Sequence, residues 1–204
     1  MVTLSPNNFY HIYNHANGNE NLFRSGDNYS FFLKKYAFHI SPIADTFAYC
    51  LLPNHFHILV QIKDKETLRK TFPKFETLEK LETLEKLEKG ISKQFSNFFS
   101  SYTQSYNKIY SRKGSLFIKN FNRKPIDNPT YFTNTIHYIP NNPQHHGFGI
   151  SSADWPWSSY QSLISDKKTL LKREGTLTLF GSKQQFIQKH QEPIDPSFFN
   201  EFSY

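Results

Sequence analysis

Alternating hydrophobic and polar positions predict strands in the first third of the chain. Residues 8 to 15 alternate and end at an Asn-Gly turn, which predicts a first strand. Two more apolar runs, residues 45 to 52 and 55 to 62, are separated only by Pro53 and Asn54. Because Pro and Asn favour turns, we expect these two runs to be consecutive strands joined at that step.

Helical periodicity appears between and after these strands. Apolar residues spaced three and four apart after Asp27 predict a helix that ends near Pro42. A longer amphipathic helix is predicted by apolar positions that share one helical face. They are Ile91, Phe95, Phe98, Phe99, Tyr102 and Tyr106. We expect a fourth strand over residues 115 to 124, and Asn128 followed by Pro129 predicts the start of another helix.

The order strand, helix, strand, strand, helix, strand, followed by a further helix, is the ferredoxin-like arrangement. We therefore predict an α+β fold: a ferredoxin-like (RRM-like) antiparallel sheet with helices on one face and an additional helix after it. Residues 1 to 150 form the main domain in this interpretation, and residues 151 to 204 form a helical C-terminal extension. Within the extension we expect short helices at residues 154 to 160 and 183 to 190.

A charged helical insertion is predicted at about residues 66 to 90, and it contains a near-repeat of six residues. Its leucines recur every third position, so they drift around a helix instead of forming a straight seam. Its Glu and Lys residues stand four apart in the favourable order. We favour a solvated extension of the following helix over the alternative, a protruding helix that contacts a partner subunit.

Composition narrows the classes of function only slightly. The chain has 204 residues, with 24 Lys and Arg against 17 Asp and Glu, which gives a net charge of +7. That charge is compatible with nucleic acid, an acidic membrane surface or no specific partner. Aromatic residues make up 17%, and rings interleaved with basic side chains suit base stacking, although most of them must form the core. The single cysteine, Cys50, lies in an apolar run and is expected to be a buried thiol. No membrane span or signal peptide is evident, so we expect a soluble cytoplasmic protein.

His55 and His57 provide the first sign of chemistry. In an extended strand they point to one face and Phe56 to the other, with their backbones roughly 7 Å apart. That spacing allows two imidazoles to share one metal ion. The alternative is a pair of half-exposed strand histidines with no ligand.

Four segments of the chain match one known pattern: residues 52 to 60, which contain the histidine pair, and residues 112 to 117, 138 to 143 and 157 to 160. With these segments the chain resembles the single-tyrosine HUH transposases, in particular the REP-associated tyrosine transposases related to insertion-sequence TnpA proteins. The similarity runs from about residue 8 to residue 165.

The resemblance implies a metal-dependent enzyme that cleaves and rejoins single-stranded DNA at hairpins through a 5′-phosphotyrosine. By position it implies that His55, His57 and Asn142 hold a divalent cation, Mg²⁺ or Mn²⁺, and that Tyr138 is the nucleophile. One departure from the motif is Pro140, which disfavours helical geometry before it; a break there would move Asn142 away from the histidines.

Other residues near Tyr138 in the sequence are expected to have other roles. Tyr131, one heptad before Tyr138, is expected not to react, and His137, His145 and His146 are expected to face solvent or phosphate. Five cations bracket the fourth strand and are expected to follow a DNA backbone. They are Arg112, Lys113, Lys119, Arg123 and Lys124.

Two other functions stay open at this stage. One is a domesticated, non-catalytic module that binds DNA or RNA with sheet aromatics. The other is a relaxase or replication initiator with the same chemistry. Members of the family that the chain resembles occur both as monomers and as homodimers, so both oligomeric states stay open.

Overall fold

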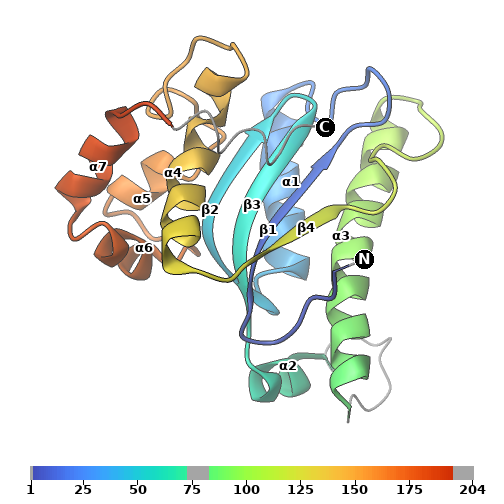
Figure 1. Cartoon of the computed structure of the whole chain (residues 1–204). Helices are drawn as coiled ribbons and strands as arrows, with labels where there is room; N and C mark the ends of the chain where they lie inside the picture. Colours follow the sequence, from blue (N-terminus) through green and yellow to red (C-terminus); the bar gives the residue numbers. More distant parts are fainter. Residues whose placement is uncertain (1, 73–82, 195–204) are drawn as a thin grey trace.

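The computed structural model describes residues 2 to 72 and 83 to 194, and its centre is a four-stranded antiparallel sheet. The strand order is β2-β3-β1-β4 (Figure 1). The strands are β1 (Phe9–His15), β2 (Ala44–Leu52), β3 (His55–Ile62) and β4 (Asn122–Ile126). With α1 (Gly26–His39) after β1 and α3 (Leu84–Ile109) before β4, this is the ferredoxin-like order. The predicted fold class is confirmed.

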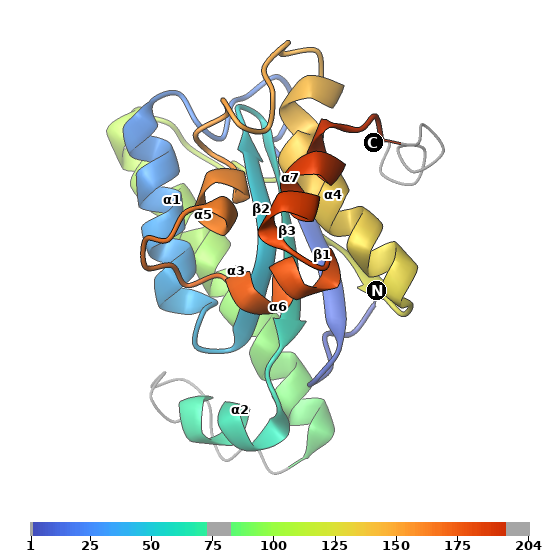
Figure 2. The same ribbon diagram turned by 90° about the vertical axis from the view of Figure 1, so that its left-hand side faces the viewer.

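The two faces of the sheet are covered by different helices (Figure 2). On one face, Ile12, Phe56 and Ile58 pack with the aromatic stripe of α1 and α3. On the other face, Leu59 packs with α4 (Pro129–His145). Successive strand residues point to opposite faces, so the same β3 residues that build the core place His55 and His57 toward α4.

The fourth strand is shorter and later than the predicted range of 115 to 124. Residues before Asn122 form only an isolated bridge, between Phe117 and Ala16 just beyond β1, and the Ile118 amide donates to the His15 carbonyl at the end of β1. Leu116 and Phe117 are adjacent and both pack into the core on the α1 and α3 face, whereas successive residues of a strand point to opposite faces. Asn120 adopts a left-handed φ of 65°, which also interrupts the extended chain.

The predicted charged insertion lies partly outside the described residues, which omit 73 to 82. The described part begins with a separate short helix, α2 (Lys65–Thr71), and continues at the start of α3. There Thr83 caps the helix by accepting a hydrogen bond from the backbone of Lys86. Most of the near-repeat, and therefore its interpretation, falls in the part that is not described.

The C-terminal extension covers the outer edge of β2. It contains α5 (Tyr160–Ile164), α6 (Arg173–Leu179) and α7 (Lys183–Gln191). The predicted helix at 183 to 190 is confirmed, whereas residues 154 to 159 are not helical: they contain turns and a bridge from Ser158 to Cys50 before α5. The Leu51 amide donates to the Trp157 carbonyl and the Ser159 amide to the Tyr49 carbonyl, so an otherwise open sheet edge is paired. None of the helices in the described ranges combines the length and apolarity that a membrane crossing requires.

Candidate functional site

The site lies on the α4 face of the sheet, where β1 and β3 run side by side. Antiparallel register pairs His15 with His55 and Tyr13 with His57. The His15 and His55 rings stack with centroids 5.6 Å apart, and the Tyr13 and His57 rings do the same at 5.6 Å. β1 therefore contributes a second row of rings beside the predicted histidine pair. The alternation of His11, Tyr13 and His15 along β1 is visible in the sequence, but only the register of β1 with β3 connects it to the site.

Three histidines could hold a metal ion together. His55 and His57 from β3 and His146 at the C-terminal end of α4 each bring a ring nitrogen to within 4.8 Å of the other two. The Nε2 atoms of His55 and His146 are 3.2 Å apart. His146 was expected to face solvent or phosphate; it is exposed, yet it lies beside His55. Neutral imidazole nitrogens at this spacing suit a divalent transition metal.

Hydrogen bonds fix the orientation of both strand histidines. His55 Nδ1 lies 2.8 Å from the Asn54 side-chain oxygen, which can only accept, so Nδ1 carries the proton and Nε2 keeps its lone pair. His57 Nδ1 lies 2.9 Å from His11 Nε2, while the buried Nε2 of His57 has no hydrogen-bond partner among the described residues. When His57 donates to His11, both strand histidines present an unprotonated Nε2. Such outer hydrogen bonds are typical of metal-binding histidines, so the residues present fit a metal.

The electrostatics of the cluster favour neutral imidazoles. Burial lowers the pKa of His55 to about 3, with His146 and His15 adding repulsion. Burial, with a smaller contribution from Lys124, lowers the pKa of His11 to about 3. The pKa of His57 is also held well below its ordinary value, mainly by burial. Neutral imidazole is the form that binds metal.

The helix that carries Tyr138 continues through Pro140, although a proline disfavours helical geometry at this position. Asn128 caps the helix by accepting from the Tyr131 amide at 2.7 Å. Pro143 has no N–H for the carbonyl of Ile139, and the Asn142 side chain donates to that carbonyl at 3.2 Å. The same Asn142 amide donates to the Tyr138 carbonyl at 3.0 Å.

Tyr138 lies next to the histidines and is only 2% exposed. Its ring centroid is 5.7 Å from that of His57 and 6.3 Å from that of His11. Burial raises the pKa of Tyr138, and a hydrogen bond with Asn142 opposes this effect. Asn142 is fully buried and directed toward its own helix, and His146 is the third side chain of the imidazole cluster.

The remaining side chains near Tyr138 divide into buried and exposed ones. His137 is 4% exposed and packs 5.1 Å from the ring of His190, so the expectation that it faces solvent is wrong. His145 is exposed, as expected. Tyr131 is half-buried, with the Lys124 ammonium 4.8 Å from its ring centre.

The five predicted DNA-contacting cations differ in exposure and in the groups that they contact. Arg112 ties down a turn: it pairs with Glu20 at 2.9 Å and donates to the carbonyls of Gly114 and Ser115. Lys113 and Lys119 are exposed.

Arg123 and Lys124 are half-buried on β4. The Arg123 guanidinium lies 4.0 Å from the ring centre of Phe121 and donates to the Ser92 hydroxyl. Lys119 and Arg123 both line a cavity between α3 and the segment that leads into β4.

Comparison with known proteins adds one likeness of fold. A solved structure described as a REP-associated tyrosine transposase bound to a REP hairpin superposes with a TM-score of 0.52 at 15% sequence identity. The match covers 81% of this chain and 84% of that chain. No protein-family model matches the sequence, and no curated protein matches it. The chain therefore has the fold of a REP-associated tyrosine transposase, the family that its motifs resemble.

Proposed function

We propose that this protein is a metal-dependent transposase of the single-tyrosine HUH type, which cleaves and rejoins single-stranded DNA at hairpins. The observation that carries the proposal is the convergence of His55, His57 and His146 beside Tyr138. The fold supports it, since the similar solved structure is a tyrosine transposase that holds a hairpin.

The residues of the cluster are divided between metal binding and the covalent step in this proposal. His55, His57 and His146 hold a divalent cation, and imidazole ligands favour Mn²⁺ over Mg²⁺. Asn142 stays a candidate fourth ligand through its side-chain oxygen. When bound, the cation neutralises charge on the scissile phosphate and favours the phenolate form of tyrosine.

Tyr138 performs the covalent step. Its phenolic oxygen bonds to phosphorus as the bond from phosphorus to the 3′ oxygen breaks, and the phenol proton ends on that leaving oxygen. The 5′-phosphotyrosine link conserves the energy of the broken bond, so rejoining needs no nucleotide hydrolysis. Because Tyr138 is buried, DNA has to displace a side chain to reach it, and we assign that role to the exposed His145, whose ring centroid is 6.3 Å from that of Tyr138.

A pool of hairpin-bearing strands with randomised flanks, labelled at the 3′ end, tests the proposal. Wild-type protein with Mn²⁺ should form a labelled species that survives denaturing electrophoresis, and Tyr138→Phe should not. Tyr131→Phe and Tyr13→Phe are matched controls that remove a neighbouring hydroxyl and should still react. Reaction by Tyr138→Phe would show that the nucleophile is wrong.

The burial of Tyr138 favours one alternative, a non-catalytic module that binds nucleic acid. The same assay separates the two, because such a module would retain the hairpin pool in a native gel and give no covalent species with any divalent metal.

A further inference from the structure

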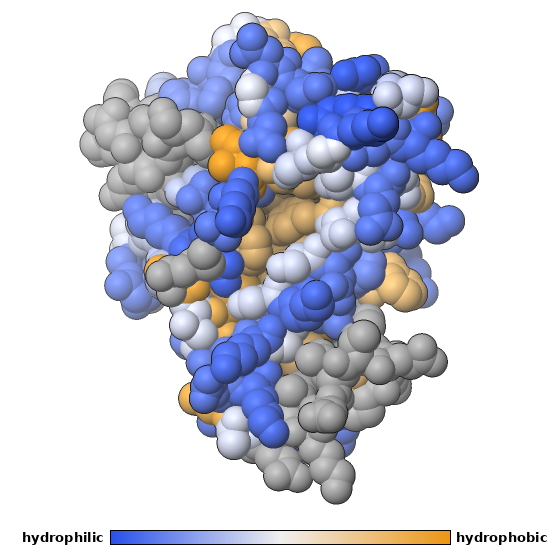
Figure 3. Space-filling view, turned by 90° about the vertical axis from the view of Figure 1, so that its right-hand side faces the viewer, coloured by the Kyte–Doolittle hydropathy of each residue, from blue (hydrophilic) through white to orange (hydrophobic). Residues whose placement is uncertain are grey.

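A cavity lies between β1, α3 and the segment that leads into β4, away from the histidine cluster. Between α3 and residues 115 to 123 the surface is hollowed into a cavity of about 480 Å³, called here the edge pocket. Figure 3 shows it as an apolar floor framed by hydrophilic side chains. Its volume falls in the range typical of small-ligand sites, roughly 300 to 1,000 Å³.

Three phenylalanines contribute to the floor of the edge pocket: Phe99, Phe117 and Phe121. The Phe99 ring centroid is 5.0 Å from that of Phe117 and 5.2 Å from that of Phe121. Each ring is between 5% and 9% exposed, so all three are anchored in the core and show a small apolar surface. Such a surface suits a flat ring stacked against it.

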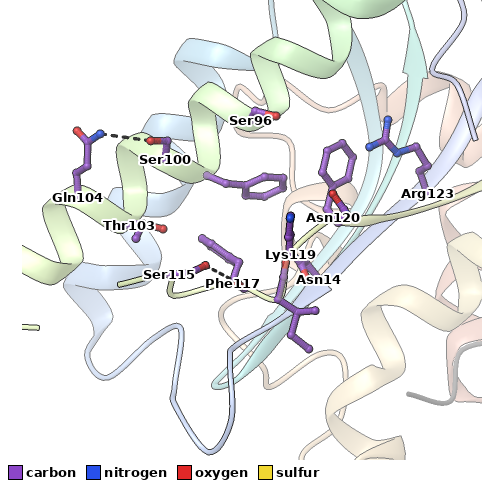
Figure 4. Close-up of a pocket in the computed structure, with 13 residues that line it drawn as sticks. Asn14, Ser96, Ser100, Thr103, Gln104, Ser115, Phe117, Lys119, Asn120 and Arg123 are labelled. Carbon is purple, nitrogen blue, oxygen red and sulfur yellow. Dashed lines mark hydrogen bonds between the residues drawn. The ribbon is translucent and has the colours of Figure 1, made fainter. Parts of the chain in front are cut away.

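The walls of the edge pocket are polar and uncharged. Ser96, Ser100 and Thr103 stand along α3 on one side, and Asn120 stands opposite (Figure 4). Hydroxyl and amide groups both donate and accept, so they can match the edge of any nucleobase. The asparagine side chain of Asn14 donates to the Ile118 carbonyl at 3.1 Å, which fixes the opposite wall before a ligand arrives.

The rim of the edge pocket is positively charged. Lys119 and Arg123 line it, and none of its described lining residues is Asp or Glu. A neighbouring groove, which shares Ser96 and Arg123, does contain Glu85 and Glu88. Lys89 pairs with Glu85, whereas Glu88 accepts from the neutral Ser5 hydroxyl and keeps its charge. Within the edge pocket itself, the two cations of the rim complement a phosphate.

Strand β1 contributes neighbouring residues to the edge pocket and to the candidate active site. Asn14 lines the pocket, and the next residue, His15, points to the other face and stacks on His55. The Ile118 amide donates to the His15 carbonyl at 2.9 Å. A strand of DNA that follows this edge of the sheet can reach both places.

We infer that the edge pocket binds one unpaired nucleotide of the DNA. The choice of DNA as the ligand rests on the proposed function. The base stacks on the phenylalanine floor and bonds to the α3 hydroxyls, and its phosphate lies between Lys119 and Arg123. Aromatic stacking, hydrogen bonding and cationic contact in one cavity are the combination that single-stranded nucleic acids require.

The test compares two hairpins that differ by one bulged thymidine. Binding is measured by fluorescence anisotropy with EDTA present and in the Tyr138→Phe background, so that neither metal nor cleavage contributes. The bulged hairpin should bind about tenfold more tightly than the paired one, the size expected for one stacked base. Ser100→Trp fills the pocket from an exposed helix position and should abolish the preference, whereas Ser30→Trp, an exposed serine on α1, should keep it.

A second pair of variants tests the rim. Lys119→Ala should weaken binding of the bulged hairpin severalfold more than Lys34→Ala, which removes an equally exposed charge on α1. An equal effect of the two variants would overturn the phosphate contact.

The outcomes separate the edge pocket from the proposed function. A bulge preference that Ser100→Trp leaves unchanged overturns the pocket alone, and so does the absence of any preference when the protein with Tyr138 intact forms the covalent adduct. A preference that is lost in Ser100→Trp, when the protein with Tyr138 intact forms no adduct, supports the pocket and overturns the chemistry. Failure to bind either hairpin overturns both.

Discussion

His11 is predicted to position His57 for metal binding without touching the metal itself. It is fully buried, and its Nε2 atom lies 2.9 Å from His57 Nδ1. Replacing it with phenylalanine keeps a ring of similar size but removes the acceptor that holds the His57 ring. Loss of such an outer partner generally lowers metal affinity about 10- to 100-fold, which is about 1.4 to 2.7 kcal/mol.

The same substitution should also lower the free energy of unfolding, because His57 Nδ1 is left buried without a partner. That cost is about 1 to 3 kcal/mol. Calorimetry with Mn²⁺ measures the affinity, and urea denaturation measures the stability of the same preparation. His39→Phe is the matched control, since this half-buried histidine lies on α1, on the opposite side of the sheet.

The reasoning fails if His11→Phe binds Mn²⁺ as tightly as wild type while His57→Ala does not bind it. That result would mean that the ring of His57 is oriented by packing alone. An affinity loss of the same size in His39→Phe would show instead a general effect of removing a histidine.

The remaining predictions concern hydrogen bonds and charge. Asn54→Ala removes the acceptor of His55 Nδ1 and should weaken Mn²⁺ binding about tenfold in calorimetry, with no loss if another group orients the ring. Arg112→Ala should destabilise the fold by about 1 to 3 kcal/mol in urea, since its guanidinium bonds to Glu20 and to backbone carbonyls; an unchanged midpoint would contradict a structural role. Burial lowers the pKa of His11 to about 3 and that of His190 to about 4, so the unfolded chain takes up protons first. The free energy of unfolding should therefore fall as pH drops from about 6.5 toward 4, and an unchanged urea midpoint between pH 7 and pH 5 would contradict this.

The pattern of apolar residues was sufficient to predict the sheet and the placement of the histidine pair. Alternation in β3 buries Phe56 and Ile58 on one face, which leaves His55 and His57 together on the other. A period of two allows no other arrangement once the buried face is known. This part of the site follows from local geometry.

Other parts of the site depend on contacts between distant segments, which no local pattern contains. His11 meets His57 only through the register of β1 with β3, and His146 meets His55 only because α4 continues past two prolines. Pro140 disfavours helical geometry locally, but tertiary packing overrides this preference. The carbonyl of Ile136, which Pro140 leaves without a donor, lies 3.4 Å from His190 of α7.

The range of the fourth strand was wrong for a related reason. Residues 115 to 121 contain the apolar residues of a strand, yet Leu116 and Phe117 are both needed in the core. Two consecutive side chains that point into the same core require an irregular backbone, and the resulting segment forms one wall of the edge pocket.

The proposed chemistry is tested most directly by the intact mass of the protein after incubation with a hairpin strand and Mn²⁺. The account predicts a species heavier by the mass of the 3′ fragment, with the fragment mapped to the peptide that contains Tyr138. Tyr13→Phe should give the same species and Tyr138→Phe should give none. DNA attached to Tyr13 or Tyr131, or a heavier species from Tyr138→Phe, would contradict the account.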